Sequence, residues 1–243
     1  MFPYDPALLA AVQPTPATIA DVIRMQEAID GLCAEGDGLK WFNGLYLEVT
    51  RAVQTRAGSR GQDAFADPAF MAALDVEFAR FYFDALRGWL AGRPTPGCWQ
   101  AVFDRRNQAA IARIQFALAG MNAHINHDLA QAVANTCREA GIAPQHGTTQ
   151  YEDFTALNTT LDSLIEAAKL ALNVRLPGDA LPPVTNLEDT LAAWSMTAAR
   201  EAAWNNGELI AHLHGEPLLL AGLLNTLDGM TELASTTLLV PVP

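Results

Sequence analysis

The sequence predicts an all-α protein, a single-domain helical bundle of about six or seven helices. Every long apolar pattern repeats at intervals of three or four residues, and glycine and proline separate these patterns at distances typical of helices. The tail 238–243 is the stretch that looks extended, and its two prolines exclude it from the centre of a sheet. Half of the residues are hydrophobic and 17% are charged, which suits a compact globule with a sizeable core.

The first half of the chain contains three expected helices. Residues 19–33 keep an apolar stripe that glycines 36 and 38 end, and residues 39–56 form a second amphipathic segment that ends before the polar loop 58–61. Asp67 followed by Pro68 has the form of an N-cap with proline at the first helical position. We therefore expect the third helix to begin there.

The second half is expected to contain a long helical region over residues 98–139 and another helix over 151–173. Thr185 with Glu188 three positions later forms a capping box that begins a helix toward His212, with Gly207 as a weak point, and Pro217 begins the last helix. The domain spans residues 1–243, with irregular termini over 1–15 and 235–243.

Charge and cysteine content limit the partners and the compartment. A net charge of -12 repels phosphate backbones and anionic membranes, so we expect neither nucleic acid nor a membrane as partner. Three scattered cysteines indicate neither a disulfide framework nor a thiolate zinc site. The N-terminus lacks the features of a signal peptide, and the longest strongly apolar run, 217–224, is too short to span a bilayer. These observations favour the cytoplasm, and they leave the oligomeric state open.

The most site-like residues lie in the heptapeptide 122–128, Asn-Ala-His-Ile-Asn-His-Asp. On an α-helix His124, His127 and Asp128 share a face, because they stand at positions i, i+3 and i+4. A carboxylate four residues after a histidine orients the ring and stabilises its protonated form. His124 and Asp128 are therefore the candidate catalytic pair, and the polar set is expected to be buried between apolar flanks.

Four other residues are candidates for binding a substrate. Asn122 and Asn126 would position polar groups beside the pair. Tyr82 lies among aromatic and charged residues that could line a pocket, and Trp204 stands in a stripe with Arg200 and Glu208 that could recognise an anionic or aromatic ligand. Core packing and surface ion pairs are the more common explanation of the last two patterns.

Two alternatives remain open for the heptapeptide. His124, His127 and Asp128 could hold zinc or iron in a hydrolase or oxygenase, if a second element such as one carrying Asp75 or Glu208 supplied a further ligand. The same side chains could instead bond to neighbouring groups and lock helices together in a ligand-binding or structural protein.

The favoured interpretation is a small-molecule enzyme that performs acid–base chemistry without a metal or other cofactor. A lyase, isomerase or cyclase acting on a small apolar metabolite, in specialised metabolism, would suit an acidic helical protein with aromatic residues near its polar cluster.

The segment 116–129 resembles the motif of an uncharacterised bacterial family of unknown function, and the resemblance covers most of the chain. Its other landmarks are Trp41 to Asn43, the stretches 74–78 and 82–84, and Arg200 with Trp204. The resemblance implies that position 127 can hold other residues, which weighs against an obligatory metal site with two histidines. It implies no activity and no cofactor.

Overall fold

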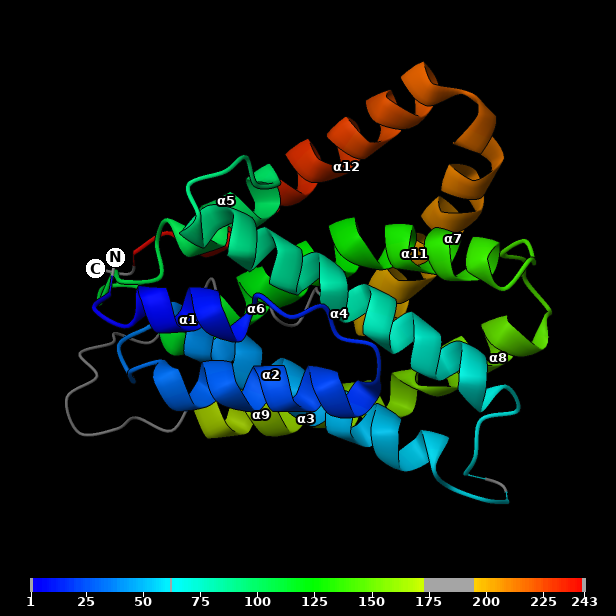
Figure 1. The fold of residues 1–243 in the computed structure, drawn as a ribbon, viewed down its shortest axis with the longest axis horizontal. Helices are drawn as coiled ribbons and strands as arrows, with labels where there is room; N and C mark the ends of the chain where they lie inside the picture. The colour runs from blue at the N-terminus through cyan, green and yellow to red at the C-terminus, as the bar shows by residue number, and fades with distance from the viewer. Residues whose placement is uncertain (1, 62, 173–194, 242–243) are drawn as a thin grey trace.

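The computed structural model describes residues 2–61, 63–172 and 195–241, and within these ranges every regular element is a helix (Figure 1). The predicted all-α fold is therefore confirmed. Seven long helical segments of the described chain form the bundle: α2 (Ile19–Leu32), α3 (Gly38–Ala57), α4 (Pro68–Leu90), the rod made of α6 (Arg113–Ala123), a π-helical turn η1 (His124–Asp128) and α7 (Leu129–Glu139), then α9 (Asn158–Leu172), α11 (Met196–His212) and α12 (Pro217–Leu238). Shorter elements are α1 (Asp5–Ala11), α5 (Gly97–Phe103), α8 (Thr149–Ala156) and the 3-10 turn η2 (Leu213–Gly215).

Side-chain caps explain where several helices begin. The Asp67 carboxylate accepts a hydrogen bond from the Phe70 N–H at 3.0 Å, which confirms the predicted start of α4. Ser195 caps α11 by accepting a bond from the Ala198 N–H. The expected capping box of Thr185 and Glu188 lies outside the described residues.

The rod of α6, η1 and α7 packs against α3 and α4 on one side and α11 and α12 on another (Figure 1). Glycine permits the closest approaches. A Cβ atom at Gly120 would lie 2.3 Å from the Phe42 ring of α3, and one at Gly207 would lie 2.9 Å from Val133 of α7. Gly207, expected to weaken its helix, thus allows α11 to pack on α7.

The expected continuous helix over 98–139 was wrong, because α5 ends at Phe103 and α6 begins only at Arg113. Arg106 lies between them and is 2% exposed. Its guanidinium pairs with the Asp37 and Asp5 carboxylates, the latter at 3.0 Å. A buried cation must be paired, and its two acidic partners come from the N-terminal region. The chain therefore leaves the helical path to bring Arg106 to them.

The termini are more ordered than expected. Within residues 1–15 the structure forms α1, whose Leu8 side chain is fully buried. At the other end α12 continues to Leu238, and the Ser235 side chain is buried against α6. Most of α12 lies at the edge of the bundle (Figure 1). None of the helices in the described ranges combines the length and the apolar character needed to cross a membrane.

Candidate functional site

The heptapeptide lies where the rod changes from an α-helix to a π-helical turn. The Leu129 N–H bonds to the His124 carbonyl, five residues back, in place of the usual four. Asn122, His124 and Asp128 are 6%, 1% and 1% exposed, so the predicted burial is confirmed. The expectation of a plain α-helix was wrong at this turn. Such π turns are frequent at functional sites.

Asp128 is the centre of the polar network. Its Oδ2 atom accepts hydrogen bonds from His124 Nδ1 and Trp99 Nε1, both at 2.9 Å, and its Oδ1 atom accepts one from His127 Nδ1 at 2.7 Å. Burial alone would raise the pKa of Asp128, but the hydrogen bonds from the two histidines outweigh it and lower that pKa. The carboxylate therefore stays ionised and binds both rings.

His124 lies inside an aromatic shell. Its ring stacks on Phe78 of α4 at a centroid distance of 3.5 Å, and the Tyr46 ring of α3 meets it at 4.5 Å. Burial lowers the pKa of His124, which favours the neutral imidazole. Since Nδ1 bonds to Asp128, the neutral ring carries its proton there, and the lone pair of Nε2 is buried without a hydrogen-bond partner.

A small cavity of about 40 Å³ adjoins this shell, and Tyr46 and Phe78 help to line it. Asp75 also lines it, and burial raises the pKa of this carboxyl from 3.8 to about 7. Asp75 Oδ2 and the Tyr46 hydroxyl are both buried without hydrogen-bond partners. Arg200 closes another part of the wall, and burial lowers its pKa to about 9. Two residues of the cavity wall, Asp75 and Tyr46, thus carry unpaired polar atoms. His124, whose Nε2 atom is also unpaired, does not line the cavity but contacts two residues of its wall, Tyr46 and Phe78.

Comparison with known proteins identifies the family. Residues 19–241 match the model of DUF5995, which is described as a family of unknown function. The chain belongs to DUF5995. The predicted resemblance to a family of unknown function is confirmed by this match, which includes the rod and the cavity. No curated protein and no solved structure matched the chain.

In this DUF5995 chain, Asn122 and Asn126 bond within the protein. Asn122 Nδ2 donates to the Thr231 carbonyl at 3.0 Å and to Ser235 Oγ at 2.9 Å, and so joins α6 to α12. Asn126 Nδ2 donates to Asn122 Oδ1 at 2.8 Å. Asn122 therefore locks two helices together, and only the half-buried Asn126 retains some access to solvent.

Tyr82 and Trp204, the other predicted binding residues, lie in different parts of the DUF5995 fold. Tyr82 belongs to the aromatic shell of His124, at a centroid distance of 6.2 Å, and its hydroxyl donates to Asn43. Trp204 is fully buried on α11 against Phe154, and its Nε1 atom donates to Glu208. The structure thus brings Tyr82, but not Trp204, into contact with His124.

His127 faces a second group that the sequence did not indicate. Its ring, the Cys98 thiol of α5 and the Asp228 carboxylate of α12 place one ligating atom each within 4.8 Å of one another. Burial, with the Asp128 and Asp228 carboxylates, raises the pKa of the Cys98 thiol far above its usual value. Because Cys98 and Asp228 are 130 positions apart, no sequence spacing could have paired them. The odd number and scattered positions of the cysteines, with no CxxC pair, indicated no thiolate zinc site in the sequence.

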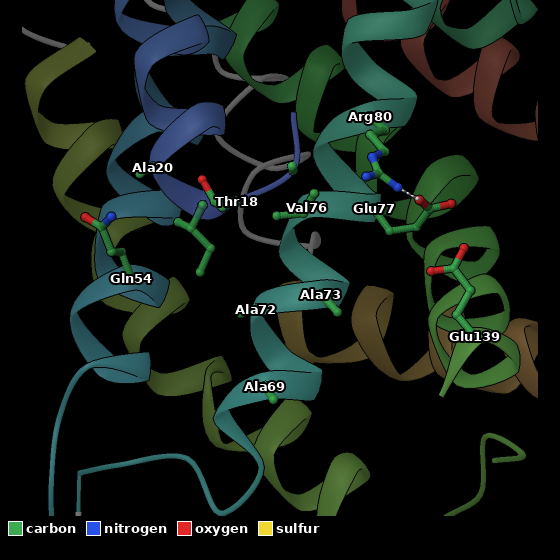
Figure 2. Close-up of a pocket in the computed structure, with 12 residues that line it drawn as sticks. Thr18, Ala20, Gln54, Ala69, Ala72, Ala73, Val76, Glu77, Arg80 and Glu139 are labelled. Atoms are coloured by element: carbon green, nitrogen blue, oxygen red, sulfur yellow. Dashed lines mark hydrogen bonds and ion pairs between the residues drawn. The ribbon is translucent and has the colours of Figure 1, made fainter. Parts of the chain in front are cut away.

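A wide groove of about 560 Å³ lies on the other face of α4, bounded by the start of α2 and by α3 and α7 (Figure 2). Alanine side chains line much of its floor, and the Glu77–Arg80 ion pair lies at its rim (Figure 2). Arg80 also donates to the Pro16 carbonyl before α2, at 3.2 and 3.0 Å, and so holds the start of α2 against α4. Asp84 pairs with Arg87 outside the groove. The polar groups of this groove lie on its surface, and none of the described residues that line it has a buried side-chain polar atom without a partner, so we place the chemistry at the buried network.

Proposed function

We propose that this DUF5995 protein is a small-molecule enzyme in which His124 transfers a proton without a metal. The observation that carries the proposal is the unpartnered Nε2 atom of a fully buried histidine whose Nδ1 atom is fixed on Asp128. This arrangement supplies an oriented lone pair, and Asp128 stabilises the imidazolium that forms when the lone pair takes a proton. We place the protein in the cytoplasm, where its three free cysteines stay reduced.

The adjoining cavity supports a substrate that is mostly apolar with one polar end. Its walls combine leucine, valine and phenylalanine side chains with Asp75, Tyr46 and Arg200. Its 40 Å³ exceeds the minimum of about 10 to 15 Å³ that one ordered water requires, so the cavity has room for at least one water. The polar end of a metabolite would displace this solvent, and the remainder would require side chains to move. Because its pKa is raised to about 7, the Asp75 carboxyl is about half protonated near neutral pH and is a second group that can donate or accept a proton.

Hydrogen-bond geometry favours this role over a metal held by His124, His127 and Asp128. Both imidazoles approach the carboxylate through Nδ1, at 2.9 and 2.7 Å. Two ligands on one tetrahedral zinc ion, at bonds near 2.0 Å, stand roughly 3.3 Å apart. The three groups therefore point at one another as donors and acceptor, and not at a common ion.

The structural alternative explains Asp128 and Asn122, whose hydrogen bonds join helices. It does not explain the unpaired polar atoms. A buried donor or acceptor without a partner lowers the free energy of unfolding by about 1 to 3 kcal/mol. A purely structural network gains nothing that would offset this loss.

Deuterium exchange tests the proposal without a known substrate. The purified protein is incubated with an extract of small apolar metabolites in D₂O, and mass spectrometry follows both new products and molecules that gain mass. The comparison is with His124→Gln and with His212→Gln, a matched control on the surface of α11. Circular dichroism establishes that each variant is folded.

We expect a conversion or exchange that the native protein and His212→Gln share and that His124→Gln loses by about a hundredfold or more, the usual contribution of an acid or base. Equal rates for His124→Gln would refute the role of His124. No conversion by any of the proteins would favour the non-catalytic alternative.

A further inference from the structure

Three ligating side chains meet where the start of α5, the π turn and α12 come together. They are Cys98, His127 and Asp228, with one sulfur, nitrogen or oxygen atom of each within 4.8 Å of the others. Cys98 and His127 are buried and Asp228 is half-buried. The group lies on the opposite side of Asp128 from His124, so it does not depend on the function proposed above.

The surrounding hydrogen bonds hold two of the three ligands in place. His127 Nδ1 bonds to Asp128 Oδ1 at 2.7 Å, which leaves Nε2 as the atom available to an ion; the Gln131 amide contacts Nε2 at 3.4 Å. A carboxylate behind a histidine ligand is the usual support of a bound metal, since it fixes the ring and its tautomer. Asp228 is fixed by the N–H groups of Gly97 and Cys98, at 2.8 and 2.9 Å.

Gly97 lets the acidic face of α12 approach α5. A Cβ atom there would lie 3.3 Å from Asp228 Oδ2 and 2.4 Å from Glu232 Oε2. A side chain at position 97 would therefore displace both carboxylates. Glu232, one turn after Asp228, brings a further oxygen ligand close to the group.

We propose that Cys98, His127 and Asp228 bind one zinc ion. A thiolate, an imidazole and a carboxylate together suit zinc, whereas calcium and magnesium prefer oxygen ligands alone. Tetrahedral zinc holds such ligand atoms roughly 3.3 to 3.8 Å apart. Because these atoms now lie within 4.8 Å of one another, the side chains would move together by about 1 to 1.5 Å at most when the ion binds. The fourth position is left to water or Glu232. As the zinc–sulfur bond forms, the Cys98 thiol releases its proton to solvent.

A bare thiol–imidazole nucleophile is the weaker explanation of the same residues. A cysteine nucleophile reacts as the thiolate, and a carboxylate beside a buried thiol disfavours that form. A divalent cation between the two groups reverses this effect, because it attracts both negative charges. Zinc would also join α12 to α5 and to the rod, at a helix whose own buried side chains are few.

Cobalt binding to the full chain tests the proposal, because cobalt replaces zinc and shows a sulfur-to-cobalt charge-transfer band when a thiolate is bound. The protein is stripped with a chelator, and equimolar Co²⁺ is then added. The variants are Cys98→Ala and Asp228→Asn, with Cys137→Ala as a control that removes another fully buried cysteine. Elemental analysis of protein purified without chelator gives the zinc content.

We expect one zinc per chain in the native protein. The charge-transfer band should persist in Cys137→Ala and be lost in Cys98→Ala. In Asp228→Asn the band should require at least tenfold more Co²⁺ than in the native protein. Native protein without the band, or an equal band in Cys98→Ala, would overturn the proposal. If Cys98→Ala fails to fold, the native spectrum and Asp228→Asn still decide. None of these readouts depends on catalysis by His124.

Discussion

Replacement of Asp75 by asparagine should stabilise the protein, and the gain should depend on pH. The carboxyl is buried on α4, its Oδ2 atom has no hydrogen-bond partner, and burial raises its pKa from 3.8 to about 7. Tyr46 of α3 and Arg200 of α11 are the ionisable groups that share its cavity. Asparagine has nearly the shape of the protonated acid and cannot ionise, so Asp75→Asn removes the cost of the charge.

The sign and size of the change in stability caused by Asp75→Asn follow from the linkage between protonation and folding. Between the unfolded pKa of 3.8 and the folded value near 7, the folded protein holds a proton that the unfolded chain has released. The favourable contribution of the protonated acid is thus complete below the unfolded pKa and is lost as pH rises through 7. The loss is about 1.4 kcal/mol per pH unit and about 4 kcal/mol in all. The Asp75→Asn variant does not show this loss of stability, because asparagine does not ionise.

Urea unfolding at several pH values measures the effect. The free energy of unfolding of Asp75→Asn minus that of the native protein should grow from about pH 5.5 to about pH 7 and then stay constant. Asp84→Asn, an exposed change on the same helix, serves as control and should shift stability by less than about 1 kcal/mol. A constant difference across this range, or destabilisation above pH 7, would show that Asp75 is an ionised and paired group, and would refute the argument.

Three further changes test the packing around the site. Gly120→Ala places a Cβ atom 2.3 Å from the Phe42 ring and should destabilise the fold by about 1 to 3 kcal/mol in thermal unfolding. Gly44→Ala on α3, whose Cβ atom would make only an ordinary contact with Asp30 Oδ1 at 3.9 Å, should be neutral or stabilising, and equal effects of the two changes would contradict the close crossing of α3 and α6. Trp99→Phe removes one of the three donors to Asp128 and should lower the free energy of unfolding by about 2 kcal/mol, against less than about 1 for Trp89→Phe, whose bond to Asp104 is exposed. Arg106→Met leaves Asp37 and Asp5 without their cation and should cost about 3 to 5 kcal/mol in urea unfolding, while a loss below 1 would mean that the loop 104–112 is held by something else.

The helices could be predicted where a local cause determines them. Asp67 and Pro68 begin α4 through contacts within four residues, and the apolar flanks of the heptapeptide were sufficient to predict that Asn122, His124 and Asp128 are buried. Such signals are complete within one stretch of sequence.

The features that were missed depend on residues far apart in the chain. The break before α6 exists because Arg106 binds acids near the N-terminus. The π turn places His124 against α3 and α4 while His127 faces α5 and α12, so its register depends on partners from four helices. The approach of Cys98 to Asp228 likewise requires the folded position of α12.

Asp128 contributes to both proposed sites, because it binds His124 of one site and His127 of the other through different carboxylate oxygens. A carboxylate with three donors is well satisfied, so its burial alone indicates a structural role. The evidence for a function beyond a structural role is the set of polar atoms on either side of Asp128 that the hydrogen bonds to this carboxylate do not use. On one side His124 Nε2, Tyr46 and Asp75 keep unpaired polar atoms near a small cavity. On the other side a ring nitrogen of His127 lies within 4.8 Å of a thiol and a carboxylate, those of Cys98 and Asp228. Because each histidine uses Nδ1 on the same aspartate, Asp128 fixes two separate rings toward two separate sites, and loss of one site should leave the other ring oriented.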